Sequence, residues 1–183
     1  NMNIIQTTLP GVLLIEPKVF GDERGFFFES FNALDFAQAT GISSPFVQDN
    51  HSHSAKGVLR GLHYQIEQAQ GKLVRAVTGE VYDAVVDLRR SSPTFGRCEG
   101  FVLSAQNKRM LWVPPGFGHG YYVMSESTDF LYKTTDYYAP QHERCVLWND
   151  PAVGVPWPLS GGEPTLSGKD RLGLLLADAP VYP

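Results

Sequence analysis

Residues 58–65, with the sequence VLRGLHYQ, place a histidine and an arginine in a stretch whose other residues suit a β-strand. His63 has an ordinary pKa of about 6.5, so its imidazole can accept and return a proton near neutral pH. A strand used only for packing would be more uniformly apolar. The pattern therefore indicates either a general base in a binding site or a histidine held by structural hydrogen bonds.

The spacing of Arg60 and His63 conflicts with the regular geometry of a strand. Alternation places Leu59, Gly61 and His63 on one face and Arg60 on the other, so a regular strand cannot direct both side chains at one ligand. A β-bulge at Gly61 would remove the conflict, because an extra residue changes the face of those that follow it. The sequence leaves both arrangements open.

The sequence HSH at residues 51–53 raises a second kind of chemistry. Two histidines at i and i+2 share a strand face, and barrel enzymes combine such a pair with a third histidine and a carboxylate to bind iron, manganese or zinc. The expected carboxylate would follow about four or five residues later, where this chain has Gly57 and Val58. Glu67 or His119 would have to substitute. Because the ligand set is incomplete, we expect surface histidines and no metal site.

The composition fits one globular domain spanning residues 1–183, with 43% hydrophobic residues to form a single core. A net charge of −4 argues against broad nucleic-acid binding, and no apolar run reaches the roughly 18 residues that span a bilayer. Cys98 and Cys145 form no CxxC pattern, which favours buried free thiols. No leader sequence opens the chain, so we expect a cytoplasmic protein that binds neither membranes nor nucleic acid.

Short runs rich in valine, phenylalanine and tyrosine alternate with glycine, proline, asparagine and aspartate along the chain. This rhythm predicts an all-β fold, either a jelly roll or a small barrel with a central pocket. One helix is expected at 32–40, capped by Asn32 and ended by Gly41, and a short helical turn near 167–173. The GE dipeptide at 79–80 predicts a tight hairpin between the strands on either side. The expected strands cover residues 11–17, 25–31, 58–65, 72–78, 80–88, 100–105, 109–114, 120–125 and 128–135.

A series of sequence blocks, in consistent order, resembles the dTDP-4-dehydrorhamnose 3,5-epimerase family. The resemblance extends from about residue 3 to residue 175. It implies a cupin-type jelly roll, a homodimer that exchanges N-terminal strands, no metal or other cofactor, a dTDP-4-keto-6-deoxysugar substrate and a place in dTDP-L-rhamnose synthesis. The blocks are VFGDERGFFFESFN, FVQDNHS, VLRGLHYQ, AQGKLVRAVTGEVYDAVVDLR, SPTFG, LWVPPGFGHG, FLYKTTDYY, LWNDPAVGVPWP and LSGKD.

The resemblance assigns the chemistry of epimerisation to four residues. Inverting a carbon beside a ketone requires a base that removes a C–H proton on one face and an acid that delivers a proton to the other. The resemblance implies that His63 is the base, that Asp170 orients it, and that Tyr132 is the acid. Lys72 would stabilise the enolate oxygen as its charge forms. On sequence alone, Tyr132 would be a packing residue and Lys72 a solvated strand start.

The resemblance also implies a nucleotide site, which needs cations for the diphosphate and an aromatic ring for thymine. Arg60 would hold phosphate while His63 acts on the sugar, and Tyr138 would stack on the base. The other expected substrate-binding residues are Arg24, Glu29, Gln48, Asp49, Asn50, His119, Glu143 and Lys169.

Three alternatives remain open at the level of sequence. A relative that inverts one carbon, or acts on another dTDP-4-keto-6-deoxysugar, would keep the same base and acid. A metal-dependent enzyme of this fold would depend on a bound metal. A noncatalytic sugar-binding jelly roll would bind the nucleotide sugar but exchange no protons. The tail after Asp170 is expected to pack against the domain or to complete a dimer.

Overall fold

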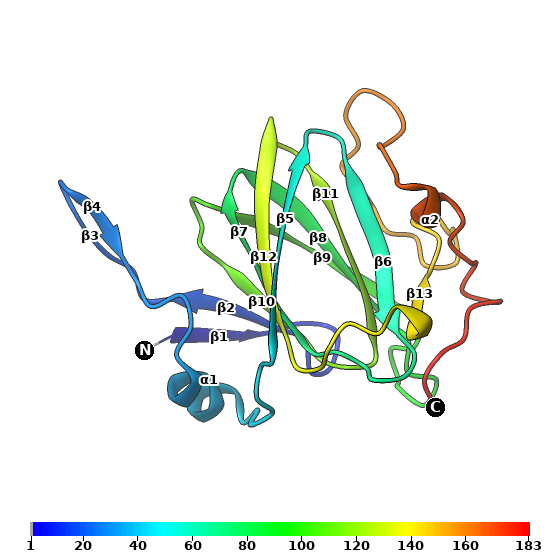
Figure 1. The fold of residues 1–183 in the computed structure, drawn as a ribbon, viewed down its shortest axis with the longest axis horizontal. Helices are drawn as coiled ribbons and strands as arrows, with labels where there is room; N and C mark the ends of the chain where they lie inside the picture. Colours follow the sequence, from blue (N-terminus) through cyan, green and yellow to red (C-terminus); the bar gives the residue numbers. More distant parts are fainter. Residues whose placement is uncertain (1) are drawn as a thin grey trace.

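The computed structural model describes residues 2–183 and consists mainly of two antiparallel sheets that face one another (Figure 1). Its elements are β1 (Met2–Gln6), β2 (Leu13–Pro17), β3 (Phe20–Asp22), β4 (Gly25–Phe27), α1 (Ala33–Thr40), β5 (Gln48–Ala55), β6 (Leu59–Gln65), β7 (Lys72–Thr78), β8 (Glu80–Asp87), β9 (Cys98–Ser104), β10 (Met110–Val113), β11 (Phe117–Val123), β12 (Ser127–Thr134), the 3-10 helix η1 (Pro140–His142), β13 (Glu143–Cys145) and α2 (Gly168–Arg171). The six-stranded sheet has the order β1-β2-β10-β7-β12-β5, and the five-stranded sheet has the order β13-β6-β11-β8-β9. The predicted all-β jelly roll with a few short helices is confirmed.

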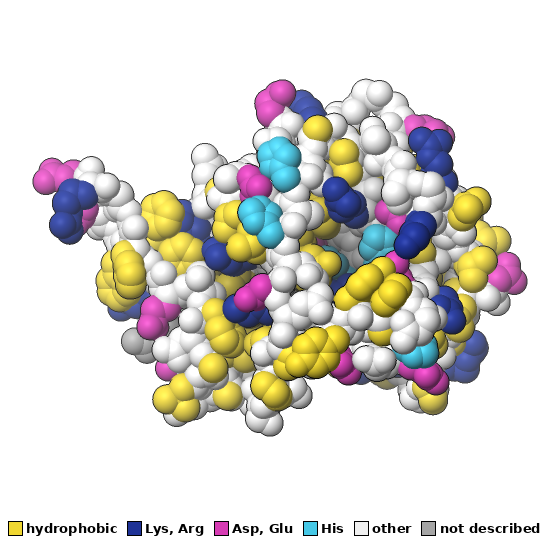
Figure 2. All heavy atoms as spheres, in the orientation of Figure 1, with side chains coloured by type: hydrophobic (Ala, Val, Ile, Leu, Met, Phe, Trp, Pro, Cys, Tyr) yellow, Lys and Arg dark blue, Asp and Glu magenta, His cyan; other side chains and the backbone are white. Residues whose placement is uncertain are grey.

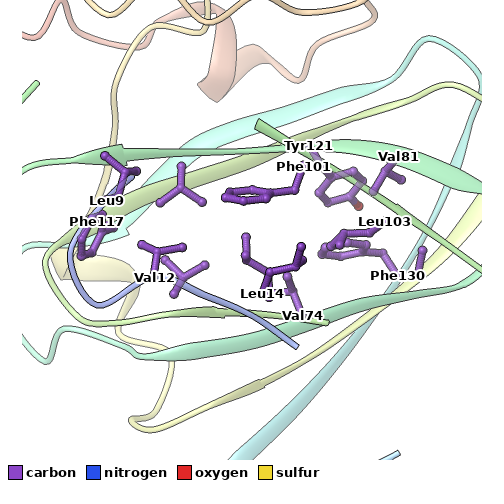
Figure 3. Close-up of a cluster of buried hydrophobic side chains, with 14 of the residues drawn as sticks. Leu9, Val12, Leu14, Val74, Val81, Phe101, Leu103, Phe117, Tyr121 and Phe130 are labelled. Atoms are coloured by element: carbon purple, nitrogen blue, oxygen red, sulfur yellow. The ribbon is translucent and has the colours of Figure 1, made fainter. Parts of the chain in front are cut away.

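The main hydrophobic core lies between the two sheets (Figure 3). Strand alternation places Val74 of β7 and Phe130 of β12 on the inner face of the six-stranded sheet, opposite Val85 of β8 and Tyr121 of β11. The rings of Tyr121 and Phe130 stack with centroids 4.2 Å apart. Burying side chains of this size contributes roughly 1.5–3 kcal/mol each, so these contacts hold the two sheets together.

Each sheet also buries part of its outer face. The C-terminal segment crosses the five-stranded sheet, where Tyr64 donates a hydrogen bond to the carbonyl oxygen of Pro180 (2.6 Å). Helix α1 covers the six-stranded sheet, with Phe36 against Trp112. The tail therefore packs against the domain, which is one of the two roles that the sequence leaves open.

The predicted helix at 32–40 is confirmed as α1, and so are both of its caps. The side chain of Asn32 accepts a hydrogen bond from the amide of Asp35 (3.0 Å). Gly41 adopts a left-handed conformation with φ of 75°, and its amide donates to the carbonyl oxygen of Ala37. The predicted C-terminal turn is confirmed as α2. In the described part of the chain, neither helix has the length and apolar character to cross a membrane.

The predicted hairpin at 79–80 is wrong. β7 pairs with β10 and β12 in the six-stranded sheet, whereas β8 pairs with β9 and β11 in the other. Gly79, with a positive φ of 72°, carries the chain from one sheet to the other, and a Cβ there would lie 2.1 Å from the carbonyl oxygen of Ser127. A glycine between two apolar runs is therefore compatible with a crossing between sheets as well as with a turn inside one.

Other differences concern strands at the edges of the fold. The sequence does not predict β1, β3, β5 or β13: β5 (QDNHSHSA) is polar on both faces, and the other three are short strands. The strand expected at 25–31 ends at Phe27, where β3 and β4 form a two-stranded ribbon that projects from the body (Figures 1 and 2). In this ribbon Phe20, Phe26 and Phe27 are 57%, 63% and 67% exposed.

Candidate active site

A cavity of about 340 Å³ is lined by strands of both sheets. In the space-filling view, histidine, lysine and arginine side chains gather around a hollow between β5 and β6 (Figure 2). The cavity brings together most of the site residues that the sequence predicts. Its lining comprises Gln48, Asn50, Ser52, Arg60, His63, Lys72, His119, Gly120, Tyr121, Tyr132, Tyr138 and Glu143.

A β-bulge in β6 directs both Arg60 and His63 into this cavity. His63 pairs with His119 of β11, whereas Arg60 pairs with Tyr121, so β6 has one residue more than β11 between the two pairs. Gly61 adopts a φ of 132°, and a Cβ there would lie 2.6 Å from the Cα of the facing glycine of β11. The bulge that would reconcile the two residues is therefore present, and it requires glycine.

His63 forms a hydrogen-bonded pair with Asp170, which lies 107 residues further along the chain. The distance from His63 Nε2 to Asp170 Oδ1 is 2.5 Å, and Asp170 Oδ2 accepts the amide of Gly61 at 3.2 Å. Burial acts to raise the pKa of Asp170, but the hydrogen bonds from His63, Gly61 and Ser167 outweigh it and lower the pKa below its ordinary value. The carboxylate is thus charged and holds Nε2, which leaves Nδ1 as the nitrogen able to exchange a proton.

Tyr132 and Lys72 enter the cavity from the six-stranded sheet. Lys72 shares the inner face of β7 with Val74, which explains why its side chain is buried rather than solvated. Burial lowers the pKa of Lys72 to about 8, and its Nζ lies 5.8 Å from the centre of the Tyr132 ring. Burial also raises the pKa of Tyr132, so the phenol is protonated at neutral pH. A proton donor and a cation therefore line the same cavity as His63 but come from the other sheet.

A second histidine–aspartate pair lies deeper in the site. His119 Nε2 is 2.7 Å from Asp83 Oδ2, and both side chains are buried. Burial raises the pKa of Asp83 even though His119 and Lys72 oppose that shift. The sequence analysis misses Asp83. The sequence pattern that could have revealed Asp83 is its position on the face of β8 that also carries Val81 and Val85, which are both core residues.

The mouth of the cavity carries groups suited to a nucleotide. Arg60 Nε donates to a serine hydroxyl of β5 at 2.9 Å, which fixes the guanidinium there. Gln48 accepts the backbone amide of Tyr138 (3.0 Å), and the Tyr138 ring is half exposed. Lys169 lies at the rim with its Nζ 4.0 Å from Glu143. Exposed cations and an exposed ring are the contacts that a diphosphate and a base require.

Three predicted site residues neither line this cavity nor contact a residue that lines it through a hydrogen bond or ion pair of the site described above. Arg24 is at the tip of the β3–β4 ribbon, where it pairs with Asp22 at 2.6 Å. Glu29 lines a separate cavity between the ribbon and α1. Asp49 faces outward on β5 and pairs with Lys133 at 3.0 Å. Their part in substrate binding stays a prediction.

The histidines at 51–53 also face away from the cavity. Both rings donate hydrogen bonds to Asp129 Oδ1, at 2.8 Å from His51 Nε2 and 3.2 Å from His53 Nδ1. Both rings are more than half exposed, whereas His119 is buried inside. Alternation along β5 explains the separation, since Asn50 lines the cavity and its neighbour His51 does not. The arrangement does not join this pair to His119, as a metal site facing the barrel interior would require.

A jelly roll in which a histidine–aspartate pair and a tyrosine line one cavity defines an enzyme that moves protons by acid–base chemistry. The family model for dTDP-4-dehydrorhamnose 3,5-epimerase matches residues 6–178. The chain belongs to this family.

Individual relatives agree with that assignment. The dTDP-4-dehydrorhamnose 3,5-epimerase of Pseudomonas aeruginosa is 60% identical over 182 residues, covering 100% of both chains, and that of Shigella flexneri is 56% identical, covering 99% of both. A crystal structure of the Legionella pneumophila 3,5-epimerase in complex with dTDP-4-keto-L-rhamnose matches with a TM-score of 0.96 and 52% identity, covering 98% of this chain and 95% of that one. A 3'-monoepimerase from Streptomyces bikiniensis, in complex with dTDP-quinovose, matches with a TM-score of 0.88 and 35% identity, covering 93% and 86%.

Proposed function

We propose that this chain epimerises dTDP-4-dehydro-6-deoxy-D-glucose at C3 and C5 to dTDP-4-dehydro-L-rhamnose, as a step of dTDP-L-rhamnose biosynthesis. The family membership supports the reaction, and relatives named for it cover the whole chain. The observation that carries the mechanism is the single cavity shared by His63, Lys72 and Tyr132. An epimerisation adds and removes no atoms or electrons overall, so side chains that remove and return protons are sufficient for it.

In this mechanism His63 Nδ1 removes the proton from the carbon next to the C4 ketone. The electron pair moves to the ketone oxygen, where Lys72 stabilises the enolate by about 3 kcal/mol, which is typical of one preorganised donor in a dry site. Tyr132 then delivers a proton to the opposite face of the same carbon. Asp170 supports the imidazolium that forms on His63, because its carboxylate is charged and adjacent.

Substrate binding in this proposal rests on the groups at the mouth of the cavity. Arg60 and Lys169 contact the diphosphate, and Tyr138 stacks on thymine. The other cavity residues Gln48, Asn50, His119 and Glu143 hold the sugar and nucleoside. The proposal also places the enzyme in the cytoplasm, with no nucleic-acid or membrane partner, in keeping with its net charge of −4.

The proposal includes a homodimer in which the ribbon of one copy reaches the other copy. The three exposed phenylalanines of the ribbon support this arrangement, because apolar side chains on a projecting element are stabilised by a partner surface. It would also give Arg24 and Glu29 a cavity to act in. Light scattering measures the molar mass of the wild-type chain and of Phe26→Asp, which places a charge on the proposed contact. A wild-type monomer at micromolar concentration contradicts the dimer.

Proton exchange in deuterium oxide tests the reaction. The substrate is incubated with enzyme, and the deuterium content at C3 and C5 is followed by NMR. The proposal predicts label at both carbons and none with His63→Ala. Label at a single carbon would instead identify a mono-epimerase, the activity named for the Streptomyces bikiniensis relative. Binding of the nucleotide sugar without any label would identify a noncatalytic protein.

A further inference from the structure

The His63–Asp170 pair has a third neighbour that the proposed mechanism does not use. Cys145 lies directly opposite His63 in the β13–β6 register, and its Sγ is 3.8 Å from Asp170 Oδ1. Ligand atoms of His63, Cys145 and Asp170 all lie within 4.8 Å of one another. The imidazole of the proposed base, a thiol and a carboxylate therefore form one cluster.

Two of the three separations lie within about 1 Å of the ligand–ligand distances around a tetrahedral cation. Zinc bonds of about 2.3 Å to sulfur and about 2.0–2.2 Å to nitrogen and oxygen give ligand–ligand edges of about 3.4–3.6 Å. The Cys145 Sγ to Asp170 Oδ1 distance of 3.8 Å is close to such an edge, and the His63 to Asp170 distance of 2.5 Å has to widen by less than 1 Å. His63 lines the cavity, so a fourth position would open toward solvent or substrate.

We propose that His63, Cys145 and Asp170 form an inhibitory site for a thiophilic divalent cation, of which Zn²⁺ is the representative. On binding, the Sγ–H bond of Cys145 breaks, an Sγ–Zn bond forms, and the proton passes to water. The Nε2 proton of His63 moves to Nδ1 through water, and Nε2 donates its lone pair to the cation in place of its hydrogen bond with Asp170, so that Nδ1 can no longer accept a proton from the substrate. The imidazole then loses the carboxylate that supports its protonated form, and proton abstraction stops. The effect on turnover rests on the proposed function, whereas the binding of the cation does not.

A surface cluster has to be separated from this site in any titration. His51, His53 and Asp129 form a second group with metal-ligand chemistry on the outer face of β5 and β12. His53→Ala removes one of its two imidazoles without touching the cavity, so all titrations use this background. Cys98 supplies the matched thiol control, because it lies on β9 and its Sγ contacts the carbonyl oxygen of Val153 at 3.5 Å.

The first experiment measures inhibition of proton exchange by Zn²⁺ in the His53→Ala background, with each variant normalised to its own metal-free rate. Adding Cys145→Ser should raise the half-inhibiting Zn²⁺ concentration at least about tenfold, since even outer partners of a metal change affinity by about 10–100-fold. Adding Cys98→Ser should leave it unchanged, and a chelator should restore activity. Equal inhibition of the Cys145→Ser and Cys98→Ser proteins, or equal inhibition by Mg²⁺, overturns the proposal.

The second experiment needs no catalytic activity. Co²⁺ is titrated into the same proteins, and the thiolate-to-cobalt charge-transfer absorption is recorded. The band should appear in the background protein and with Cys98→Ser, and be absent with Cys145→Ser and with Cys145→Ala. A background protein that exchanges no substrate protons before cobalt is added, but shows the band once it is added, retains the cation site and refutes the proposed function. Absence of the band from the background protein refutes the cation site.

Discussion

The two histidine–aspartate pairs are built from the same residue types but lie in different surroundings. Asp170 uses both oxygens, one toward His63 and one toward the amide of Gly61, and its pKa is lowered. Asp83 bonds His119 through Oδ2, while its Oδ1 has no hydrogen-bond partner among residues 2–183, and burial raises its pKa. Complete burial therefore raises the pKa of Asp83, whose Oδ1 has no partner, whereas the additional hydrogen bonds to Asp170 lower its pKa and favour the charge that supports an imidazolium.

The comparison is tested most strongly by removing each imidazole. His63→Ala should lower kcat by about 10²–10⁴, the range for loss of a positioned general base. His119→Ala should act mainly on KM and change kcat less, because His119 is proposed to hold substrate. Steady-state kinetics on both variants measures the difference. If His119→Ala lowers kcat as much as His63→Ala does, the assignment of the base is wrong.

Replacing each carboxylate gives the next largest difference. Asp170→Asn keeps the shape but removes the charge beside His63, so kcat should fall by at least about tenfold with little change in KM. Asp83→Asn removes a carboxylate that burial already disfavours, so its effect on kcat should be smaller. The same kinetic assay compares the two, and a larger kcat loss in Asp83→Asn would reverse the ranking of the pairs.

The bulge at Gly61 sets the position of His63 in the first pair, which makes it a separate test. Gly61→Ala places a Cβ 2.6 Å from backbone at a φ of 132°, and should reduce the free energy of unfolding by about 3 kcal/mol. Gly21→Ala is the control, since its Cβ would meet nothing closer than 3.6 Å and should cost less than about 1 kcal/mol. Urea unfolding measures both, and equal losses would show that the bulge does not require glycine.

The opposite pKa shifts of Asp170 and Asp83 predict opposite dependence of the unfolding free energy on pH. This is the smallest of the expected effects. Asp170 has a lowered folded pKa, so its contribution to stability is present above the unfolded value of about 3.9 and is lost as pH falls through the folded value. Asp83 has a raised folded pKa, so its contribution is present below about 3.9 and is lost as pH rises through the folded value. Between pH 3 and 7, the difference in unfolding free energy between wild type and variant should increase with pH for Asp170→Asn and decrease for Asp83→Asn. Slopes of the same sign would contradict this account.

Local chemistry made much of the fold predictable from sequence. The caps of α1 follow from Asn32 and Gly41 alone, and the central strands follow from apolar alternation. The bulge could be proposed from sequence because a regular strand would place Arg60 and His63 on opposite faces. The hairpin at 79–80 failed because a glycine specifies a change of direction but not the sheet that the chain enters next.

The site was harder to predict from sequence than the fold, because it depends on contacts between distant segments. β5 carries no apolar face, since its inner residues Gln48 and Asn50 line a polar cavity instead of the core. Asp170 was linked to His63 only through the family resemblance, because no local pattern connects residues 107 positions apart. Asp83 could have been found from its place among the valines of β8, since a buried acid needs a partner.

The central claim is that a base and an acid act on opposite faces of one bound keto-sugar, and Tyr132→Phe tests it most directly. This variant keeps His63 but lacks the phenolic proton. In deuterium oxide it should incorporate label at the carbon next to the ketone while the configuration of the sugar is unchanged, because His63 returns a solvent-derived deuteron to the face from which it took the proton. NMR resolves both readouts. Inverted product formed by Tyr132→Phe at the wild-type rate would contradict the claim.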